Sequence, residues 1–564
     1  MSEPSSNDQA GDLLGRARAW AAEDPDPRTK AELEQVLSTV EAGGDPTDLA
    51  DRFAGNLEFG TAGLRGALGA GTNRMNRMVV IRAAAGLAAY LKANGAGPDD
   101  SVVIGYDARH NSDVFARDTA EVMTGAGLRA LTLPRPLPTP LLAYAIRDLG
   151  CVAGVMVTAS HNPPQDNGYK VYLGDGSQIV PPADTEIADR IEAVGALADV
   201  PLGDGGEVLG DDILDRYLVT VAALVGDGQR EIRGDLTIVY TPLHGVGGTT
   251  VATVLQKVGF AAPHVAVQQA EPDPDFPTVA FPNPEEPGAM DLAMALAEEV
   301  GADVVVANDP DADRCAVAVP GPHGWQMLRG DEVGALLADH LLRQGKQGVY
   351  ATSIVSSSLL GKMAQAAGQK HQETLTGFKW IARVNGLAFG YEEALGYCVD
   401  PEHVRDKDGV SALLLVCELA AELKTDGRTL RDNLDRIARE HGLHATDQLS
   451  VRMTDPAQIP ATMDRLRSSP PTSLGGLVVE GIDDLSKGSA DLPPTDGLRY
   501  RLADNGRVVV RPSGTEPKIK AYLEVVIPMD DTLPETGGGV DAARINAVGR
   551  LDAIRRDVQE AAGL

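Results

Sequence analysis

The chain of 564 residues has little of three things that would narrow its class at once: cysteine, aromatic residues and basic stretches. Its four cysteines form no CxxC pair and no zinc-ligand spacing, which excludes a disulfide-stapled or zinc-ribbon domain. The formal net charge is −31 and no basic run is present, so we expect no nucleic-acid partner. No run of about 18 apolar residues predicts a membrane span, and the polar N-terminus lacks a signal-peptide pattern. The cytoplasm is therefore the expected compartment.

Aromatic residues make up only 4% of the chain, whereas aliphatic residues and glycine are abundant. Aliphatic cores are typical of parallel strands covered by helices on both faces. The length is too great for one hydrophobic core, so several domains are expected. Cys151 and Cys315 lie in or beside apolar runs, which predicts buried core thiols.

Strand and helix patterns alternate three times along the chain, and a different pattern follows. Residues 13–37 predict helical material broken by a DPDP turn. Strand–helix alternation then covers the first 200 residues, returns at 236–260, and returns again over about 328–445. The remaining residues show hairpin-like strands and a closing helix, which indicates a smaller α+β domain.

The segment TASHNPPQDNGYK at 158–170 follows an apolar run, CVAGVMVTAS, that predicts a buried strand ending in a loop. Ser160 would then be exposed at the end of the strand, followed by His161 and by two prolines that hold the loop open. A surface turn with a helix cap is the alternative interpretation of the Ser-His pair.

Three aspartates alternate after a second apolar run: Asp309, Asp311 and Asp313 in NDPDADR at 308–314. In an extended loop their carboxylates would point to one side and repel one another unless a cation neutralises them. Hard oxygen ligands favour Mg²⁺ or Ca²⁺. The spacing lacks the glycine and glutamate of an EF-hand, and a solvated acidic turn is the alternative.

Two later segments combine glycine with charged or hydroxyl side chains. GYEEALGY at 390–397 places a carboxylate pair between glycines, and carboxylates accept hydrogen bonds from sugar hydroxyls. RPSGTEPKIKAY at 511–522 lies between two predicted strands and has the residue mix of a phosphate cradle. Its candidate residues are Arg511, Ser513, Gly514, Thr515 and Lys518.

Taken in order, these four segments resemble the active-site loops of the α-D-phosphohexomutases, the phosphoglucomutase/phosphomannomutase family. The resemblance implies that Ser160 carries a phosphoryl group, with His161 or Lys170 as proton-transfer candidates. It further implies that Mg²⁺ binds Ser160 and the three aspartates, and that Arg314 and Glu392 contact the substrate. Ala394 stands where the family's GExS loop has its serine, which leaves the identity of the sugar open.

Three shorter matches extend the resemblance over about residues 55–525. FGTAGLRG at 59–66 implies that Arg65 lies near the reactive serine and neutralises developing charge together with Lys170. TLTGFKWI at 374–381 implies sugar contacts from Thr376, Gly377 and Lys379. HVRDKDG at 403–409 implies a phosphate-directed lysine, Lys407.

The implied fold is α/β, with three similar doubly wound α/β domains and a smaller C-terminal α+β domain around a central cleft. We expect an N-terminal extension at 1–40, followed by domains at 41–210, 211–327, 328–445 and 446–564. In that order the domains would carry the phosphoserine loop, the metal loop, the sugar-recognition loop and the phosphate-binding loop.

The implied function is a phosphosugar mutase that moves a phosphoryl group between C1 and C6 of glucose or mannose phosphate. Phosphorylated Ser160, Mg²⁺ and a sugar 1,6-bisphosphate would take part, and the bisphosphate would serve as both intermediate and activator. A phosphopentomutase is the alternative, since the EEALGY form with RDKDG is similar to a subgroup that includes such enzymes. A sugar-phosphate phosphatase and a non-catalytic sugar-phosphate-binding protein rank below both. The partner is a small sugar phosphate, with neither membrane nor nucleic acid; the oligomeric state stays open.

Overall fold

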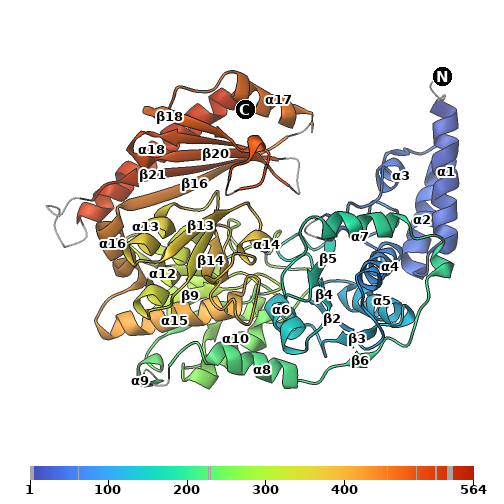
Figure 1. Ribbon diagram of the computed structural model, residues 1–564, viewed down its shortest axis with the longest axis horizontal. Coiled ribbons are helices and arrows are strands. Elements are labelled where there is room, and N and C mark those ends of the chain that lie inside the picture. Colours follow the sequence, from blue (N-terminus) through green and yellow to red (C-terminus); the bar gives the residue numbers. More distant parts are fainter. Residues whose placement is uncertain are drawn as a thin grey trace. The chain divides into compact units, whose positions relative to one another are not determined.

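The computed structural model describes residues 6–60, 63–226, 228, 230–453, 455, 457–490, 492–514, 518–529 and 538–564 (Figure 1). The chain forms two compact units. The first comprises Met1–Ala316 with Asp400–Leu414, and the second comprises Val317–Val399 with Leu415–Leu564. Within the described residues, no helix has the length and apolar character needed to cross a membrane.

The first unit begins with three helices, α1 (Ser6–Glu23), α2 (Pro27–Glu41) and α3 (Thr47–Arg52). The predicted break at the DPDP turn is confirmed, because Asp26 caps α2 by accepting a hydrogen bond from the Arg28 amide. The helices share a buried cluster with residues beyond them: Ala17, Trp20, Ala21, Leu33, Leu37, Leu49, Phe53, Ala70 and Met78. The N-terminal helices therefore pack onto the domain that follows.

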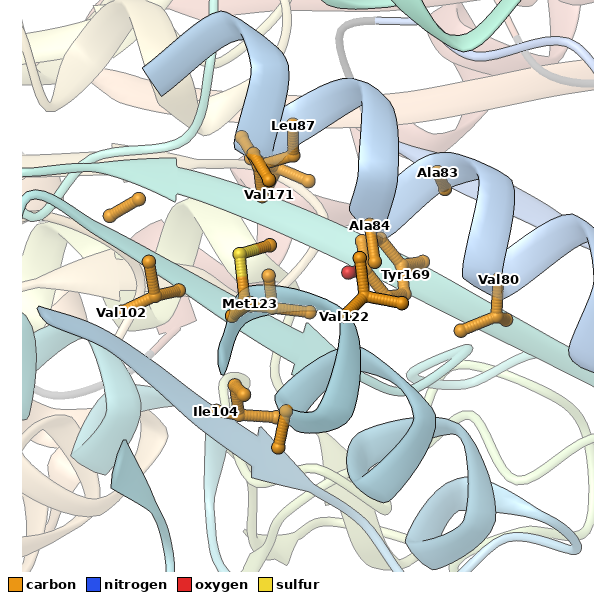
Figure 2. Close-up of a cluster of buried hydrophobic side chains, with 14 of the residues drawn as sticks. Val80, Ala83, Ala84, Leu87, Val102, Ile104, Val122, Met123, Tyr169 and Val171 are labelled. Atoms are coloured by element: carbon orange, nitrogen blue, oxygen red, sulfur yellow. The ribbon is translucent and has the colours of Figure 1, made fainter. Parts of the chain in front are cut away.

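A mixed sheet of six strands forms the core of the first α/β domain, in the order β1-β5-β4-β2-β3-β6. The strands are β1 (Leu64–Ala67), β2 (Ser101–Tyr106), β3 (Arg129–Thr132), β4 (Ala153–Val157), β5 (Asp166–Leu173) and β6 (Glu207–Val208). The helices are α4 (Arg77–Ala93), α5 (Ser112–Gly125), α6 (Thr139–Asp148) and α7 (Ala183–Glu192). Figure 2 shows aliphatic side chains of α4 and α5, such as Leu87 and Met123, meeting those of β2 and β5.

The second α/β domain has three parallel strands in the first unit, with β7 (Ile238–Thr241) between β8 (His264–Val265) and β9 (Val304–Ala307). Its helices are α8 (Asp212–Ala222), α9 (Arg230–Arg233), α10 (Gly247–Val258) and α11 (Asp291–Val300). Every residue of β7 and β9 is buried, as the apolar run before NDPDADR predicts. This sheet delivers the three-aspartate segment at the carboxyl end of β9.

From Val317 on, the second unit contains an antiparallel pair, β10 (Ala316–Gly321) with β11 (Gly324–Met327), and a four-stranded sheet in the order β13-β12-β14-β15. Those strands are β12 (Val349–Ser353), β13 (Lys370–Thr374), β14 (Leu387–Glu392) and β15 (Gly396–Cys398). The helices of this part of the chain are α12 (Gly330–Arg343), α13 (Leu359–Ala366), α14 (Phe378–Ile381), α15 (Gly409–Thr425) and α16 (Leu430–His441).

The last domain is antiparallel, with sheet order β16-β21-β20-β19-β18-β17. Its strands are β16 (Leu443–Arg452), β17 (Ser473–Leu474), β18 (Leu477–Asp484), β19 (Leu498–Leu502), β20 (Arg507–Pro512) and β21 (Lys518–Ile527). The helices α17 (Gln458–Ser468) and α18 (Gly538–Ala562) pack on this sheet through one shared apolar cluster. The prediction of three α/β domains followed by an α+β domain is confirmed. The four cysteines are free and buried, so Cys151 and Cys315 are core thiols as expected.

Candidate functional site

Ser160 lies three residues beyond β4, in the left-handed backbone region with φ of +53°. A non-glycine residue there is strained, and such strain persists only where the surroundings hold it. Only 3% of Ser160 is exposed, so the predicted exposure at the end of the strand is wrong. The cause is the three-aspartate segment: the Ser160 hydroxyl donates a hydrogen bond of 2.7 Å to Asp309 Oδ2. His161 Nδ1 lies 3.2 Å from the same hydroxyl oxygen.

Arg109 holds the Ser160 loop in place, a role that the sequence pattern did not reveal. Its guanidinium donates four hydrogen bonds to backbone carbonyl oxygens of that loop. Nη1 lies 2.9 Å from Pro163 O and 3.0 Å from Asp166 O, and Nη2 lies 2.6 Å from Ser160 O and 2.5 Å from Asn162 O. The side chain is itself almost fully buried. Four hydrogen bonds from one arginine therefore hold the strained backbone at Ser160 in place.

Asp107 supports the same loop from the end of β2. Its carboxylate accepts hydrogen bonds from Thr158 Oγ1 at 2.6 Å, from Ser112 Oγ at 2.7 Å and from the Arg109 amide at 3.0 Å. The predicted proximity of Arg65 to the serine loop is visible here, because Arg65 Nη1 donates to Asn162 Oδ1 at 3.2 Å. Asp107 and Arg109 lie in the segment GYDARHNS, whose sequence predicts a strand and a loop but gives no indication of their contacts with the serine loop.

The three aspartates converge, as their alternation predicts. Asp309, Asp311 and Asp313 are each at most 1% exposed, and one oxygen of each lies within 4.8 Å of the others. The tight loop is closed by hydrogen bonds between its own ends: the Arg314 amide donates to Asp309 Oδ1 at 3.0 Å, and Asn308 Nδ2 donates to Arg314 O at 2.6 Å. The acidic-turn alternative, which requires solvation, does not describe this buried cluster.

Cationic side chains surround the cluster. Lys170 Nζ lies 2.6 Å from Asp311 Oδ2 and 2.9 Å from Asp313 Oδ2, and Lys407 Nζ lies 3.2 Å from Asp313 Oδ2. Arg314 Nε is more distant, at 3.9 Å from Asp309 and 4.0 Å from Asp313. Lys170 and Lys407 were predicted from short sequence matches in separate parts of the chain, and the structure brings both to the same carboxylate.

Burial and these charges shift the pKa values of Asp309 and Asp313 in opposite directions. Burial raises the pKa of Asp309 well above its usual value, and the negative charges of Asp311 and Asp313 raise it further. Burial alone would also raise the pKa of Asp313, but the charges of Lys170, Lys407 and Arg314 outweigh it and hold that pKa far below its usual value. Burial lowers the pKa of His161, and the nearby Arg314 and Arg65 lower it further, so this imidazole is neutral at pH 7.

The cluster fits a hard divalent cation. Among the described residues, Asp311 Oδ1 and Asp313 Oδ1 are buried side-chain oxygens with no hydrogen-bond partner. An unpaired buried carboxylate oxygen is costly, and coordination by a cation satisfies it. Three carboxylates beside a serine hydroxyl form an all-oxygen donor set of the kind that Mg²⁺ prefers.

Lys407 belongs to a segment that is anchored inside the first unit, residues 405–409. Asp406 Oδ2 accepts hydrogen bonds from the Tyr172 hydroxyl at 2.7 Å and from Gln178 Nε2 at 2.8 Å. Asp408 Oδ1 accepts one from the Tyr217 hydroxyl at 2.9 Å, and burial raises the pKa of Asp408 to about 6. Two buried anchors thus flank Lys407 and place its ammonium at Asp313. The phosphate-directed role expected of Lys407 stays a prediction.

The predicted sugar-recognition loop is a hairpin between β14 and β15 in the second unit. Glu392 and Ala394 are half-buried. Glu393, between them, accepts hydrogen bonds of 3.0 Å from both Ser353 Oγ and Ser356 Oγ. Burial raises the pKa of Glu393 to about 7, with a further contribution from the charge of Glu392. The sequence resemblance pointed to Glu392 and gave no indication that the neighbouring Glu393 is held by two serine hydroxyls.

The neighbouring candidates from TLTGFKWI lie at the start of α14. Thr376, Gly377 and Lys379 are each half-buried. Gly377 has φ of +105°, a conformation that side-chain-bearing residues rarely adopt. The glycine therefore permits the sharp entry into this short helix.

The predicted phosphate-binding loop joins β20 to β21, so the strand–loop–strand arrangement is confirmed. Arg511, Ser513 and Lys518 are half-buried and Gly514 is exposed, while Thr515 lies outside the described residues. The Ser513 amide donates to Lys518 O at 2.8 Å across the base of the loop. The loop presents a guanidinium, a hydroxyl and a glycine backbone without a carboxylate among its described residues, which suits an anion.

The candidate residues thus fall into two sets. The first unit holds the groups with reactive chemistry: Arg65, Ser160, His161, Lys170, Asp309, Asp311, Asp313, Arg314 and Lys407. The second unit holds the groups predicted to recognise the substrate: Thr376, Gly377, Lys379, Glu392, Ala394, Arg511, Ser513, Gly514 and Lys518.

Comparison with protein families matches four successive models. These are the phosphoglucomutase/phosphomannomutase α/β/α domains I, II and III, at residues 56–197, 215–322 and 329–440, and the C-terminal domain of that family at residues 449–530. The matched ranges contain Ser160, the three aspartates, the sugar-recognition loop and the phosphate-binding loop. Together they cover most of the chain.

Two curated relatives cover most of the chain as well. A "Probable phosphomannomutase" of Haemophilus influenzae is 50% identical over 80% of this chain and 93% of its own length. A "Probable phosphoribomutase" of Schizosaccharomyces pombe is 37% identical over 89% of this chain and 92% of its own. Among solved structures, a phosphoglucomutase/phosphomannomutase family protein of Burkholderia thailandensis shares the fold, with a TM-score of 0.67, 20% identity and coverage of 89% and 97%.

Proposed function

Because this chain belongs to the phosphoglucomutase/phosphomannomutase family and is a phosphosugar mutase, we propose that it moves a phosphoryl group between C1 and C6 of a hexose phosphate through Ser160. The observation that carries the proposal is the position of the Ser160 hydroxyl, 2.7 Å from Asp309 in the three-aspartate cluster. A nucleophile beside a cation site and two lysines is an arrangement suited to phosphoryl transfer.

In the first half-reaction, the phosphoryl group of phosphorylated Ser160 passes to the free hydroxyl of the sugar monophosphate. The bond between phosphorus and the serine oxygen breaks, and a bond to the sugar oxygen forms. The sugar hydroxyl loses its proton, and the leaving serine oxygen gains one. The product is a sugar 1,6-bisphosphate. In the second half-reaction, Ser160 takes back the other phosphoryl group and releases the isomeric monophosphate.

His161 is the residue that we assign to the serine proton. Its Nδ1 lies 3.2 Å from the Ser160 hydroxyl oxygen, and its imidazole is neutral and able to accept a proton. It relays one proton in each half-reaction: from the sugar hydroxyl to the leaving serine oxygen in the first, and from the attacking serine to the leaving sugar oxygen in the second, so that it begins and ends each one neutral. Lys170 is a poorer base, because Asp311 and Asp313 raise its pKa against the effect of burial and keep it charged. Its charge instead neutralises the transferring group.

Asp309, Asp311 and Asp313, with the Ser160 oxygen, are the residues that would hold Mg²⁺. A bound Mg²⁺ supplies Lewis-acid stabilisation of negative charge on the transferring phosphoryl group. Arg65 and Lys407 flank the same carboxylates and would neutralise the remaining phosphate charge. The half-buried loops of the second unit would hold the sugar and its non-reacting phosphate.

A pentose phosphate is the second candidate substrate, and Ala394 favours it. The alanine offers no hydroxyl to a sugar ring, so the loop loses one contact that the GExS form provides. The similarity to a relative named as a phosphoribomutase also supports this candidate. A pentose substrate would use the same serine and the same aspartates, with transfer between C1 and C5.

The test is conversion of sugar 1-phosphates by the purified protein with Mg²⁺ and a trace of the matching bisphosphate. We expect kcat/KM to be highest for a hexose 1-phosphate, with measurable activity on ribose 1-phosphate, and no release of inorganic phosphate. Stoichiometric release of phosphate would instead identify a phosphatase. Mass spectrometry of the isolated enzyme should locate the phosphoryl group on Ser160, and its presence on another residue would refute the mechanism.

A further inference from the structure

The second unit contains an ion network that the proposed mechanism does not use, centred on Arg507 at the first residue of β20. Its Nε donates to Glu524 Oε2 at 2.6 Å and its Nη1 donates to Glu373 Oε1 at 3.0 Å. Its Nη2 donates to the carbonyl oxygen of Ser356. The acceptors come from β21, from β13 and from the loop after β12. A single side chain, 11% exposed, therefore ties the C-terminal sheet to the third α/β domain.

Glu524 extends this network along residues 356–358, which are three consecutive serines. Its Oε1 accepts hydrogen bonds from Ser357 Oγ at 2.7 Å and from the Ser358 amide at 2.9 Å. His444 Nδ1 lies 3.0 Å from the same oxygen. The triple-serine segment is thus bound to two adjacent antiparallel strands, β20 and β21, through one arginine and one glutamate.

The other side of the triple-serine segment contacts the sugar-recognition loop. Ser356 Oγ donates to Glu393 Oε2 at 3.0 Å, and the Glu393 amide donates back to Ser356 Oγ at 3.1 Å. Ser353 Oγ contributes a second bond of 3.0 Å to the same carboxylate. Ser356 therefore contacts Arg507 through its carbonyl oxygen and Glu393 through its hydroxyl. One residue, Ser356, therefore connects Arg507 of β20 to Glu393, the residue next to Glu392.

The opposite end of β20 opens the phosphate-binding loop. Arg511 lies four residues after Arg507, about 13 Å along an extended strand. Because β20 is paired on both sides, it is a stiff connection between the two. Tyr522 of β21 interacts electrostatically with residues of both loops. Burial raises the pKa of its hydroxyl, the charge of Glu393 raises it further, and Arg511 lowers it. The sugar-recognition loop and the phosphate-binding loop thus lie near one side chain.

We propose that Arg507 is a positioning residue that fixes the spacing between the sugar-recognition loop and the phosphate-binding loop, through Ser356 and Glu524, and thereby selects the length of the sugar phosphate. This inference rests on the proposed function. The sugar-recognition loop would contact the ring hydroxyls and the phosphate-binding loop would hold the non-reacting phosphate, and the distance between these groups differs between a hexose phosphate and a pentose phosphate. Loops held at one spacing discriminate between these lengths, whereas loops free to shift accept both.

The test compares Arg507→Lys with Arg499→Lys. Lysine keeps the charge at 507 but lacks the planar fork that serves three acceptors. We expect the ratio of kcat/KM for glucose 1-phosphate to that for ribose 1-phosphate to move toward one by about ten-fold, mainly through KM. Arg499 donates to the same Glu373 at 2.8 Å, but its second hydrogen bond goes to Asp483 at 3.2 Å, away from the triple-serine segment's own partners, Arg507 and Glu524. Its lysine variant should leave the ratio unchanged.

Ser356→Ala supplies an independent variant, should Arg507→Lys lower the melting temperature too far for assay. It removes the hydroxyl bonds to Glu393 and keeps the carbonyl that Arg507 uses, and we expect the same direction of change. Unchanged ratios in both variants, or an equal change in Arg499→Lys, would overturn the inference while an active wild type upholds the proposed function. A wild type that converts no sugar phosphate would overturn the proposed function, and the inference with it.

Discussion

The two sets of candidate residues differ in how tightly the protein holds them. In the first unit, Ser160 and the three aspartates are at most 3% exposed, and lysine, threonine, serine and backbone groups contact them on several sides. In the second unit, Glu392, Ala394, Arg511 and Ser513 are half-buried and lie in two hairpin turns or in the strand ends that lead into them. Three less exposed residues of the second unit, Arg507, Glu524 and Ser356, form the hydrogen-bonded network that supports these loops.

The difference follows from the work that each set is proposed to do. Phosphoryl transfer gains most from groups that are already in place when charge develops, so rigid burial favours it. A mutase must also bind its sugar in two orientations, which requires recognition groups that stay accessible on both occasions. Substitutions in the first unit should therefore act on kcat, and substitutions in the second unit should act on KM and on the choice of sugar. The following changes test that division.

Ser160→Ala should have the largest effect, a loss of activity of at least about 10⁴-fold, since the nucleophile is removed. The fold should be retained, because the hydroxyl contributes little more than one hydrogen bond to Asp309. Steady-state assays and thermal melting check the two parts. Ser177→Ala is the matched control: it also removes a buried hydroxyl, which donates to Asp175 at 2.6 Å, and should leave activity unchanged. Near-normal turnover of Ser160→Ala would refute the mechanism.

Asp311→Asn should lower kcat by about 100-fold and raise the Mg²⁺ concentration needed for half-maximal activity, since one charged ligand is lost. The asparagine can still accept the hydrogen bond from Thr139, which measures 2.7 Å to Asp311, so the loop should keep its shape. A titration of activity against Mg²⁺ measures both effects. Asp275→Asn, on a side chain 73% exposed, is the control. An unchanged titration would mean that the cluster is not the metal site.

These first two changes concern features that the sequence predicted well, and the reason is local. Alternation of three aspartates after a buried strand forces their carboxylates together over five residues, so the cluster was readable without knowledge of the fold. The burial of Ser160 could not be predicted from the sequence, because its hydroxyl is buried against Asp309, which lies 149 residues further along the chain. Arg109 was missed for the same reason: its partners are backbone carbonyls more than 50 residues distant, and a carbonyl carries no sequence signal.

Arg511→Ala should raise KM by about 10- to 100-fold, the range expected for loss of a charge-assisted hydrogen bond to phosphate. Because each half-reaction uses this loop, kcat should fall as well, but by less. Initial rates over a range of hexose 1-phosphate concentrations separate the two constants. Arg501→Ala, on a side chain of β19 that is 62% exposed, should change neither. A fall in kcat alone would place Arg511 among the reactive groups and break the comparison.

Glu393→Gln should change how stability depends on pH. The carboxyl has a pKa of about 7 in the folded protein against an ordinary value of 4.5, so between these values the folded state holds a proton that the unfolded chain has released. Stability contributed by this group is therefore lost as pH rises from about 4.5 to 7, by roughly 1–3 kcal/mol. Melting temperatures across this range should fall less steeply for Glu393→Gln than for wild type. Parallel profiles would contradict the assignment, and Glu440→Gln, on an exposed side chain, should match wild type.

Ala394→Ser should change activity the least, but it tests most directly which sugar the protein prefers. A site that hydrogen-bonds a hydroxyl rejects ligands that leave its polar groups unpaired, whereas alanine requires no partner. We therefore expect the wild type to convert ribose or deoxyribose 1-phosphate beside hexose 1-phosphates. The serine should shift the ratio of kcat/KM toward hexose by about one hydrogen bond, roughly 0.5–1.5 kcal/mol or about 2- to 10-fold. Ala388→Ser, at a buried position of β14, the strand that leads into the loop, controls for the added hydroxyl. If the wild type does not turn over pentose phosphates at all, Ala394 is only a spacer, and selection of the sugar belongs to the spacing of the loops rather than to this position.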